Sequence, residues 1–293
     1  MKIGILPAMY SPVATPAHLK AVARACDQAG FETLWQPEHV VLFDEQESVY
    51  PYDDETGRFP IGGEAGLLDP FIALSFIAAV TDRIRVGPGI TLVPQRNPVY
   101  TAKMVSDLDV LLGGRLIFGV GVGWQKEEFE VLQMSFEGRG EICREYLEVM
   151  KRLWEDPISE HHGKHYDMRA CRQYPKPIQK PHPPIYFGGE SKPALRRTAD
   201  LGQGWFGFNL LPADVGDKVK MLEDMLAERG RARSEVEFAV SPYRKPITFD
   251  DIERYHEHGI DQVIVVADGS STDATLRAVE EQARTILEPA RKL

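Results

Sequence analysis

The chain has 293 residues, of which 43% are hydrophobic and 27% are charged, a composition typical of soluble globular proteins. Its 34 basic and 44 acidic residues give a net charge of −10, which argues against non-specific binding to nucleic acid or to an anionic membrane. Three cysteines without CxxC spacing argue against a disulfide framework and against a zinc site, so we expect reduced thiols and no metal.

Apolar runs and amphipathic segments alternate along the whole chain. Eight runs have the length and apolarity of buried strands, and each is followed by a segment with helical spacing of apolar residues. We expect the strands at 3–6, 33–36, 84–93, 115–122, 185–187, 205–208, 236–240 and 261–267. Eight strand–helix units in a chain of this length predict one α/β domain over 1–293, a (β/α)8 TIM barrel. A doubly wound open sheet is disfavoured because no GxGxxG motif follows the first strand.

Two long segments interrupt this alternation. Residues 43–69, after the second strand, are polar and without period, which favours a lid or substrate-facing loop over a simple surface insertion. Residues 156–184, before the fifth strand, are rich in proline and histidine and predict a second irregular insertion. The HHGKH run at 161–165 has no acid or cysteine at ligand spacing, so we expect surface histidines there.

The lengths of the apolar runs indicate whether the chain is secreted or spans a membrane. The first ten residues are too weakly apolar for a signal peptide. Apolar runs stay well short of the roughly 18 residues that a membrane span needs. Together with the reduced thiols, these features predict a cytoplasmic protein.

The ends of the predicted strands carry the candidate chemistry, since barrel enzymes place their sites there. Glu38-His39 is the only adjacent acid–imidazole pair at a strand end, and such a histidine can be held in one tautomer and titrate near neutrality. The run from Gly188 to Ser191 offers backbone N–H groups and a hydroxyl at a helix start, which is either an anion site or a capped tight turn.

Glycines mark two neighbouring strands. In RLIFGVGVGW, residues 115–124, the glycines at 119, 121 and 123 allow another group to approach the backbone closely. In VGPGIT, residues 86–91, two glycines and a proline require a bulge or kink, which is either a ligand contact or an empty barrel corner.

Taken together, these segments resemble the luciferase-like monooxygenase superfamily, especially its oxidoreductases dependent on the deazaflavin coenzyme F420. The resemblance covers nearly the whole chain. It rests on segments that include LWQPEHV, DRIRVGPGITLVPQRNPVYTAK, DLDVLLGGRLIFGVGVGWQKEEFE and YPKPIQKPHPPIYFGGESKPALRRTADLGQGWF. It implies a TIM barrel that binds F420, or alternatively FMN, at its C-terminal mouth, and it also implies a homodimer.

The resemblance assigns roles to individual residues. The cofactor ring would rest against the kinked third strand, where a non-prolyl cis peptide maps onto Gly89-Ile90. His39 would donate or accept the proton, with Glu38 orienting it. The implied cofactor contacts are Gly89, Ile90, Thr91, Gly121, Gly123, Gly188, Gly189, Glu190 and Ser191. The expected walls of the substrate pocket are Met9, Trp124, Trp205 and Phe208, together with Trp35.

Three functions follow from the resemblance. The first is hydride transfer between F420 and an unknown small organic substrate. The second is an FMN-dependent monooxygenase that uses reduced flavin and O2, with a flavin or F420 reductase as a possible partner. The third is a non-enzymatic barrel, disfavoured by the intact glycines and His39. Trp124 stands where some F420-dependent sugar-phosphate dehydrogenases have a glutamate, which disfavours that activity.

Overall fold

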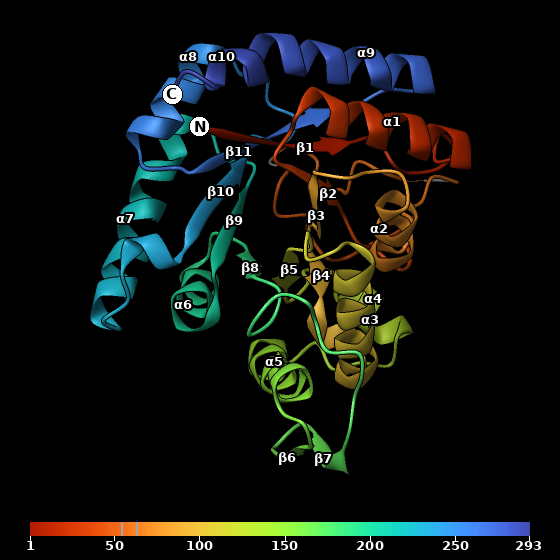
Figure 1. Ribbon diagram of the computed structural model, residues 1–293, viewed down its shortest axis with the longest axis vertical. Helices are drawn as coiled ribbons and strands as arrows, with labels where there is room; N and C mark the ends of the chain where they lie inside the picture. Colours follow the sequence, from red (N-terminus) through yellow and green to blue (C-terminus); the bar gives the residue numbers. More distant parts are fainter. Residues whose placement is uncertain (54, 63) are drawn as a thin grey trace.

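The computed structural model describes residues 1–53, 55–62 and 64–293, and it confirms the predicted barrel. The main sheet is parallel, with the strand order β3-β2-β1-β11-β10-β9-β8-β5-β4, and the helices surround it (Figure 1). Its strands are β1 Lys2–Pro7, β2 Thr33–Gln36, β3 Arg85–Pro88, β4 Thr91–Leu92, β5 Phe118–Gly121, β8 Ile185–Gly188, β9 Gly204–Phe208, β10 Glu237–Ser241 and β11 Gln262–Ala267.

The nine strands occupy the eight predicted positions, because the third predicted strand is interrupted. β3 pairs with β2 and β4 pairs with β5, and the cis peptide bond Gly89–Ile90 lies between them, where the resemblance placed it. Backbone hydrogen bonds join β3, at one edge of the sheet, to the residues that lead into β5, near the other edge. Val86 N donates to Arg115 O (3.0 Å), and Ile117 N donates to Val86 O (2.8 Å), so the barrel is nearly closed.

Local sequence signals explain where many helices begin. Thr15, Asp69 and Asn97 each accept a hydrogen bond from a backbone N–H in the first helical turn, and a proline follows each of them. The helices are α1 Pro16–Ala29, α2 Pro70–Ala78, α3 Pro98–Leu111, α4 Lys126–Val131, α5 Arg139–Glu155, α6 Lys192–Leu201, α7 Pro212–Glu228, α8 Phe249–Glu257, α9 Thr272–Gln282 and α10 Glu288–Ala290, with short 3-10 turns at Val93–Gln95 and Arg233–Glu235 and a π-helical turn at Ala283–Leu287. Across the described ranges, none of these helices has the length and apolarity of a membrane span.

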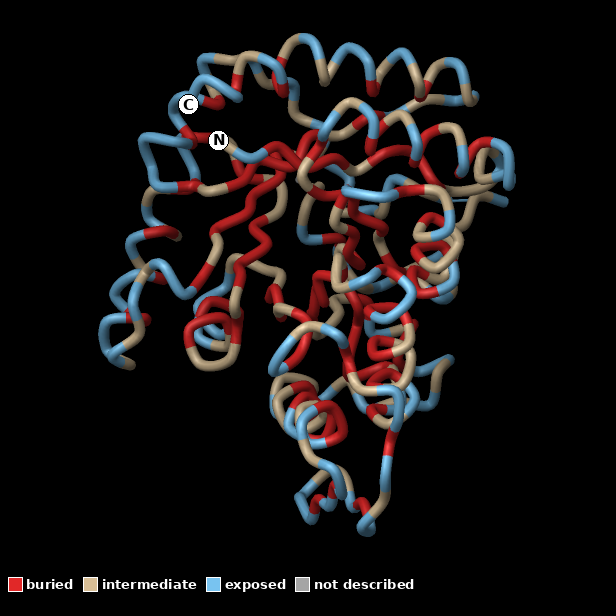
Figure 2. Tube along the Cα trace, in the orientation of Figure 1, coloured by how far each residue is buried: buried red, intermediate tan, exposed pale blue. Residues whose placement is uncertain are grey.

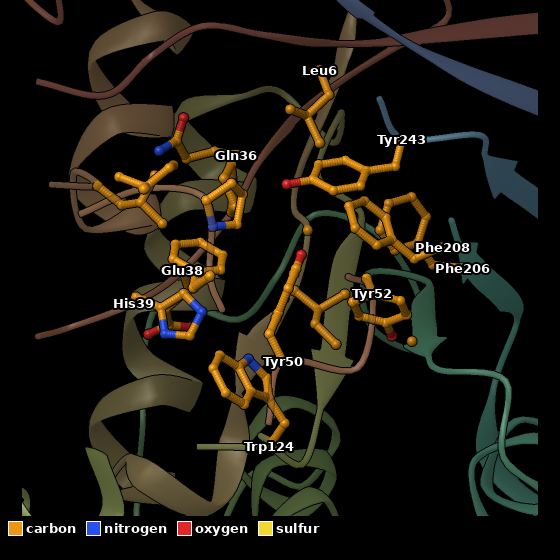
Figure 3. A pocket seen from close by; sticks show the side chains of 18 of the residues that line it. Leu6, Gln36, Glu38, His39, Tyr50, Tyr52, Trp124, Phe206, Phe208 and Tyr243 are labelled. Atoms are coloured by element: carbon orange, nitrogen blue, oxygen red, sulfur yellow. The ribbon is translucent and has the colours of Figure 1, made fainter. Parts of the chain in front are cut away.

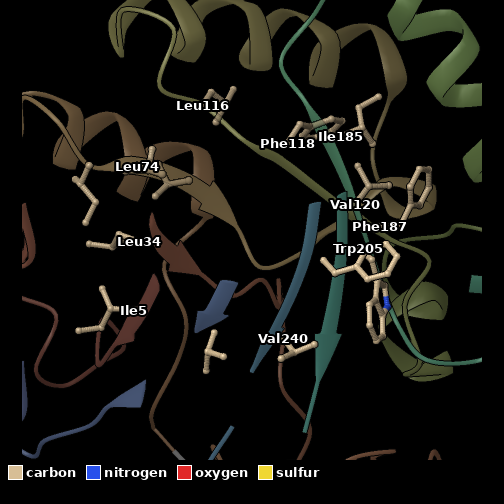
Figure 4. Close-up of a cluster of buried hydrophobic side chains, with 14 of the residues drawn as sticks. Ile5, Leu34, Leu74, Leu116, Phe118, Val120, Ile185, Phe187, Trp205 and Val240 are labelled. Carbon is tan, nitrogen blue, oxygen red and sulfur yellow. The ribbon is translucent and has the colours of Figure 1, made fainter. Parts of the chain in front are cut away.

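Apolar side chains pack on both faces of the sheet. The strands and the inner faces of the helices are buried, whereas the outer helix faces are exposed (Figure 2). The large cluster between sheet and helices includes Leu34, Phe118 and Val240 (Figure 4). A second cluster fills the barrel interior, where Trp35 stacks on Phe206 with ring centroids 4.8 Å apart. The interior is therefore a packed core.

The segment 156–184 is more ordered than its sequence indicates. It contains an antiparallel hairpin of β6 Ser159–His162 and β7 Asp167–Cys171. Of the histidines in the HHGKH run, His162 is exposed as expected, but His161 is buried with its Nε2 3.4 Å from a carboxylate oxygen of Glu145. Among the residues that the structure describes, no group of three or more His, Cys, Asp or Glu side chains is placed to hold a metal ion.

Candidate active site

A cavity of about 460 Å³ opens at the C-terminal ends of the strands (Figure 3). This volume lies within the range of about 300–1,000 Å³ that small-molecule sites occupy. The loop 43–69 contributes several of its walls, in agreement with the substrate-facing role predicted for that loop. Its aromatic lining residues are Tyr10, Tyr50, Tyr52, Phe59, Trp124, Phe206, Phe208 and Tyr243.

Most of the predicted site residues meet at this cavity, but five do not line it. Those that line it are Met9, Glu38, His39, Gly89, Ile90, Gly123, Trp124, Gly188, Gly189, Ser191 and Phe208. Those that do not are Thr91, Gly121, Glu190 and Trp205. Trp35 also lies outside the lining, in the packed interior below.

Trp205 lies on the wrong face of its strand for a pocket wall. Successive side chains of a strand point to opposite faces. Phe206 and Phe208 point into the cavity (Figure 3), whereas Trp205 belongs to the cluster between the sheet and the helices (Figure 4). The ring centroids of Trp205 and Phe238 lie 5.9 Å apart. Its indole N–H donates to Gly189 O (3.0 Å). Trp205 therefore supports the turn after β8 from behind, and Phe206 takes its predicted place in the wall.

The kink at Gly89-Ile90 explains two of the glycines. A Cβ on Gly188 would lie 2.5 Å from Cδ1 of Ile90, and one on Gly121 would lie 3.0 Å from Cγ1 and closer still to Cδ1. The Ile90 side chain thus occupies the space that these glycines leave. Gly121 was expected to contact a ligand, but it makes room for the side chain of Ile90. Thr91 is fully buried in β4 and does not line the cavity.

Glu190 contacts the loop that covers the cavity. Its Oε1 accepts a hydrogen bond from Phe208 N (2.7 Å), and its Oε2 accepts one from the Tyr52 hydroxyl (3.2 Å). Burial raises the pKa of Glu190 to about 7, although these two hydrogen bonds oppose the shift. Glu190 therefore links the turn after β8 to the loop 43–69, a contact that no local sequence signal indicated.

The pairing predicted for Glu38 and His39 is not the one observed. Glu38 accepts hydrogen bonds from Leu92 N (3.0 Å) and from Arg96 Nε (2.6 Å), and so fixes the segment after the kink. The carboxylate beside His39 belongs to Glu128 of α4, whose Oε2 lies 3.2 Å from Nδ1 of His39. Adjacent residues at a strand end point in different directions, so adjacency in sequence did not identify the partner.

The charge state of Glu128 follows from its surroundings. Burial raises the pKa of this carboxyl, but hydrogen bonds from His39, Gln95 Nε2 (3.1 Å) and Val40 N (2.7 Å) outweigh it and hold the pKa below its usual value. Glu128 is therefore ionised at neutral pH. Figure 3 shows the His39 imidazole at the cavity wall beside Trp124. The centroids of the two rings lie 5.9 Å apart.

The other end of the cavity suits an anion. Gly189 has φ +105°, a backbone conformation that favours glycine, and it leads into α6, which Ser191 caps by accepting from Ala194 N (3.4 Å). Arg197 of α6 lines the cavity, and across the described residues no carboxylate lies within ion-pair distance of it. Burial lowers the pKa of Arg197, and the nearby Arg144 and Arg139 lower it further.

The chain is similar in sequence and in structure to known proteins. A relative from Mycobacterium tuberculosis, an uncharacterised protein, is 30% identical over 270 residues, which are 92% of this chain and 93% of that protein. The structure is similar to the coenzyme F420-dependent tetrahydromethanopterin reductase of Methanopyrus kandleri, with a TM-score of 0.76, 18% identity and coverage of 99% of this chain and 98% of the other.

A second solved structure is similar over a smaller share of its length. It is the oxygenating constituent of a 3,6-diketocamphane monooxygenase of Pseudomonas putida in complex with FMN, with a TM-score of 0.63, 19% identity and coverage of 82% of this chain and 66% of the other. At such identities, both structures support a shared fold. The family model described as luciferase-like monooxygenase matches residues 2–292 of the chain. The chain therefore belongs to the luciferase-like monooxygenase family.

Proposed function

We propose that the protein is an oxidoreductase that transfers hydride between coenzyme F420 and a small organic substrate. The observation that carries the proposal is the His39–Glu128 pair at the wall of a mostly apolar cavity. Hydride transfer to or from a carbon–oxygen group requires a proton donor or acceptor near the oxygen, and a histidine paired with a carboxylate is suited to that role.

The residues present fit a phosphate-bearing, flat cofactor. Gly189, Ser191 and Arg197 would hold an anionic group at the start of α6. Gly89 and Ile90, at the kink between β3 and β4, line the same cavity, where the cofactor ring would rest against them. A bound deazaflavin would supply the hydride chemistry, and the chain would supply position and a proton.

The substrate end of the cavity selects for apolar molecules. The rings of Tyr50 and Phe59 lie 5.1 Å apart, and that of Trp124 lies 5.2 Å from Tyr50. The charges of Glu38 and Glu128 are engaged by Arg96 and by His39, respectively. A neutral substrate, with one oxygen that reaches His39, therefore avoids leaving a buried charge unpaired.

Cofactor titration is the first test. Intrinsic fluorescence of the full chain is followed while F420 and FMN are added separately, since Trp124 lines the cavity and reports on ligands there. We expect F420 to bind more tightly, and F420 absorbance to change when alcohols or carbonyl compounds are supplied. Tight binding of FMN without binding of F420 would overturn the proposal in favour of an FMN-dependent monooxygenase.

The role of His39 is tested in the same assay. We expect His39→Ala to keep cofactor binding and to lose about 10²–10⁴-fold in turnover, the usual contribution of a general acid or base. His162→Ala is the matched control, because that histidine is exposed on the β6–β7 hairpin. Unchanged turnover in His39→Ala would exclude the assigned role.

A further inference from the structure

Glu128 joins three segments of the chain at the cavity wall. Its Oε1 accepts a hydrogen bond from Val40 N (2.7 Å), at the base of the loop that covers the cavity. Its Oε2 accepts from Gln95 Nε2 (3.1 Å) and lies 3.2 Å from Nδ1 of His39. The side chain is fully buried, so the positions of these donors are fixed relative to one another.

The chemistry of this contact decides where the imidazole carries its hydrogen. An ionised carboxylate can only accept hydrogen bonds, so Nδ1 of His39 must be the donor. A neutral imidazole has one N–H, which leaves Nε2 as an acceptor. His39 lines the cavity, and in the part of the chain that the structure describes its Nε2 has no hydrogen-bond partner.

We infer that Glu128 is a positioning residue that sets the tautomer of His39, so that Nε2 faces the ligand as a proton acceptor. The inference rests on the proposed function only for its effect on turnover. A bound deazaflavin would supply the hydride acceptor. In alcohol oxidation, Nε2 of His39 would accept the hydroxyl proton while the substrate loses its C–H hydride and forms the C=O bond. The imidazolium so formed is paired with the Glu128 carboxylate, and the reverse reaction returns the same proton.

Glu128→Gln tests this inference because it preserves the shape of the side chain and changes one acceptor into a donor. Val40 N engages the position of Oε1, so the amide oxygen stays there and the amide nitrogen faces Nδ1 of His39. Two donors cannot face each other, so the imidazole hydrogen moves to Nε2. Gln95 can turn its own amide to accept from the new one, since its Oε1 has no partner within the described ranges.

Side-chain ¹⁵N NMR of the full chain with labelled histidine reports the tautomer directly. Spectra are taken at alkaline pH, where imidazoles are neutral, and His39→Gln assigns the His39 signals. We expect the Nδ1–H form in the wild type and the Nε2–H form in Glu128→Gln. The same tautomer in both proteins would overturn the inference.

Glu38→Gln is the matched control. Glu38 is a buried carboxylate beside His39 in sequence, but it bonds to Arg96 and to Leu92 N. We expect the Nδ1–H form of His39 to persist in this variant. A tautomer change in Glu38→Gln equal to that in Glu128→Gln would show that loss of any neighbouring charge suffices, which also overturns the inference.

Turnover separates this inference from the proposed function. If both hold, Glu128→Gln lowers kcat by about 10²–10⁴-fold, with cofactor affinity unchanged, because an imidazole in the wrong tautomer cannot accept the proton. A changed tautomer with unchanged kcat would uphold the positioning role of Glu128 and refute the proton-transfer role of His39 in the proposed reaction.

Discussion

The packing of Ile90 between Gly121 and Gly188 can be tested by introducing a methyl group at position 121. In Gly121→Ala the new Cβ would lie 3.0 Å from Cγ1 of Ile90 and still closer to Cδ1. On the β8 side, Cδ1 of Ile90 lies 2.5 Å from the position that a Cβ of Gly188 would take, so it already packs over the backbone of that glycine and has little room to shift further. Overpacking costs about 1–3 kcal/mol, whereas replacing a strand glycine by alanine recovers roughly 0.5–1 kcal/mol. We therefore expect a net loss of about 1 kcal/mol, within a range of about 0–2.5 kcal/mol.

Ile90→Val removes the Cδ1 methyl that causes the closest contact. Alone, it should cost about 0.5 kcal/mol, at the low end for this change because Ile90 is only partly buried. In the double variant the contact with Cδ1 no longer exists, so we expect a favourable coupling of about 1 kcal/mol. Urea unfolding of the wild type, both single variants and the double variant measures this coupling.

Gly87→Ala provides the matched control for this cycle. A Cβ there would lie 2.9 Å from Ile117 O and 3.0 Å from the Trp35 ring, and neither contact involves Ile90. Its cost should therefore add to that of Ile90→Val within about 0.5 kcal/mol. The reasoning is refuted if the stability changes of Gly121→Ala and Ile90→Val also add within about 0.5 kcal/mol in the double variant.

Two further predictions concern charged groups. Burial raises the pKa of Glu190 from 4.5 to about 7, so the free energy of unfolding of the wild type falls as pH rises through this range. Glu190→Gln lacks this titration. Between pH 5 and pH 8, its free energy of unfolding should therefore rise relative to that of the wild type by on the order of 3 kcal/mol. A pH-independent difference in urea unfolding contradicts this. Arg197→Met should weaken binding of a phosphate-bearing cofactor by about 10–100-fold, from the loss of a charge-assisted hydrogen bond, and leave the affinity for its phosphate-free form unchanged. Equal weakening of both would contradict the assignment, and the fluorescence titration measures each.

The barrel could be predicted from sequence because its signals are local. A strand reveals itself by apolarity, and a helix start by a capping residue followed by proline, as at Asp69. The same reasoning failed at Trp205, where the strand was placed correctly but its facing was not, since a run of apolar residues hides the alternation of faces. The β6–β7 hairpin was missed because its strands are short and polar, with exposed His162 among them.

The partner of His39 could not be predicted, because Glu128 lies 89 positions away in the sequence. Nothing in WQKEEFE marks the second glutamate as buried and the first as facing the loop. Only the barrel, by bringing β2 beside β3 and β5 beside β4, places the start of α4 next to the end of β2. Long-range contacts of this kind decide the chemistry of the site while leaving no periodic signal.

The same carboxylates explain why the segment over the cavity is irregular in sequence. Backbone N–H groups that lie outside helices and strands need other acceptors. Glu127 accepts from the N–H groups of Glu47 (2.5 Å) and Ser48 (2.9 Å), and Glu128 accepts from Val40 N (2.7 Å). Since α4 supplies these acceptors, the segment requires neither strand nor helix periodicity. Its displacement would break the hydrogen bond at Val40, directly beside His39, so the cover of the cavity and the His39 imidazole both depend on contacts with α4.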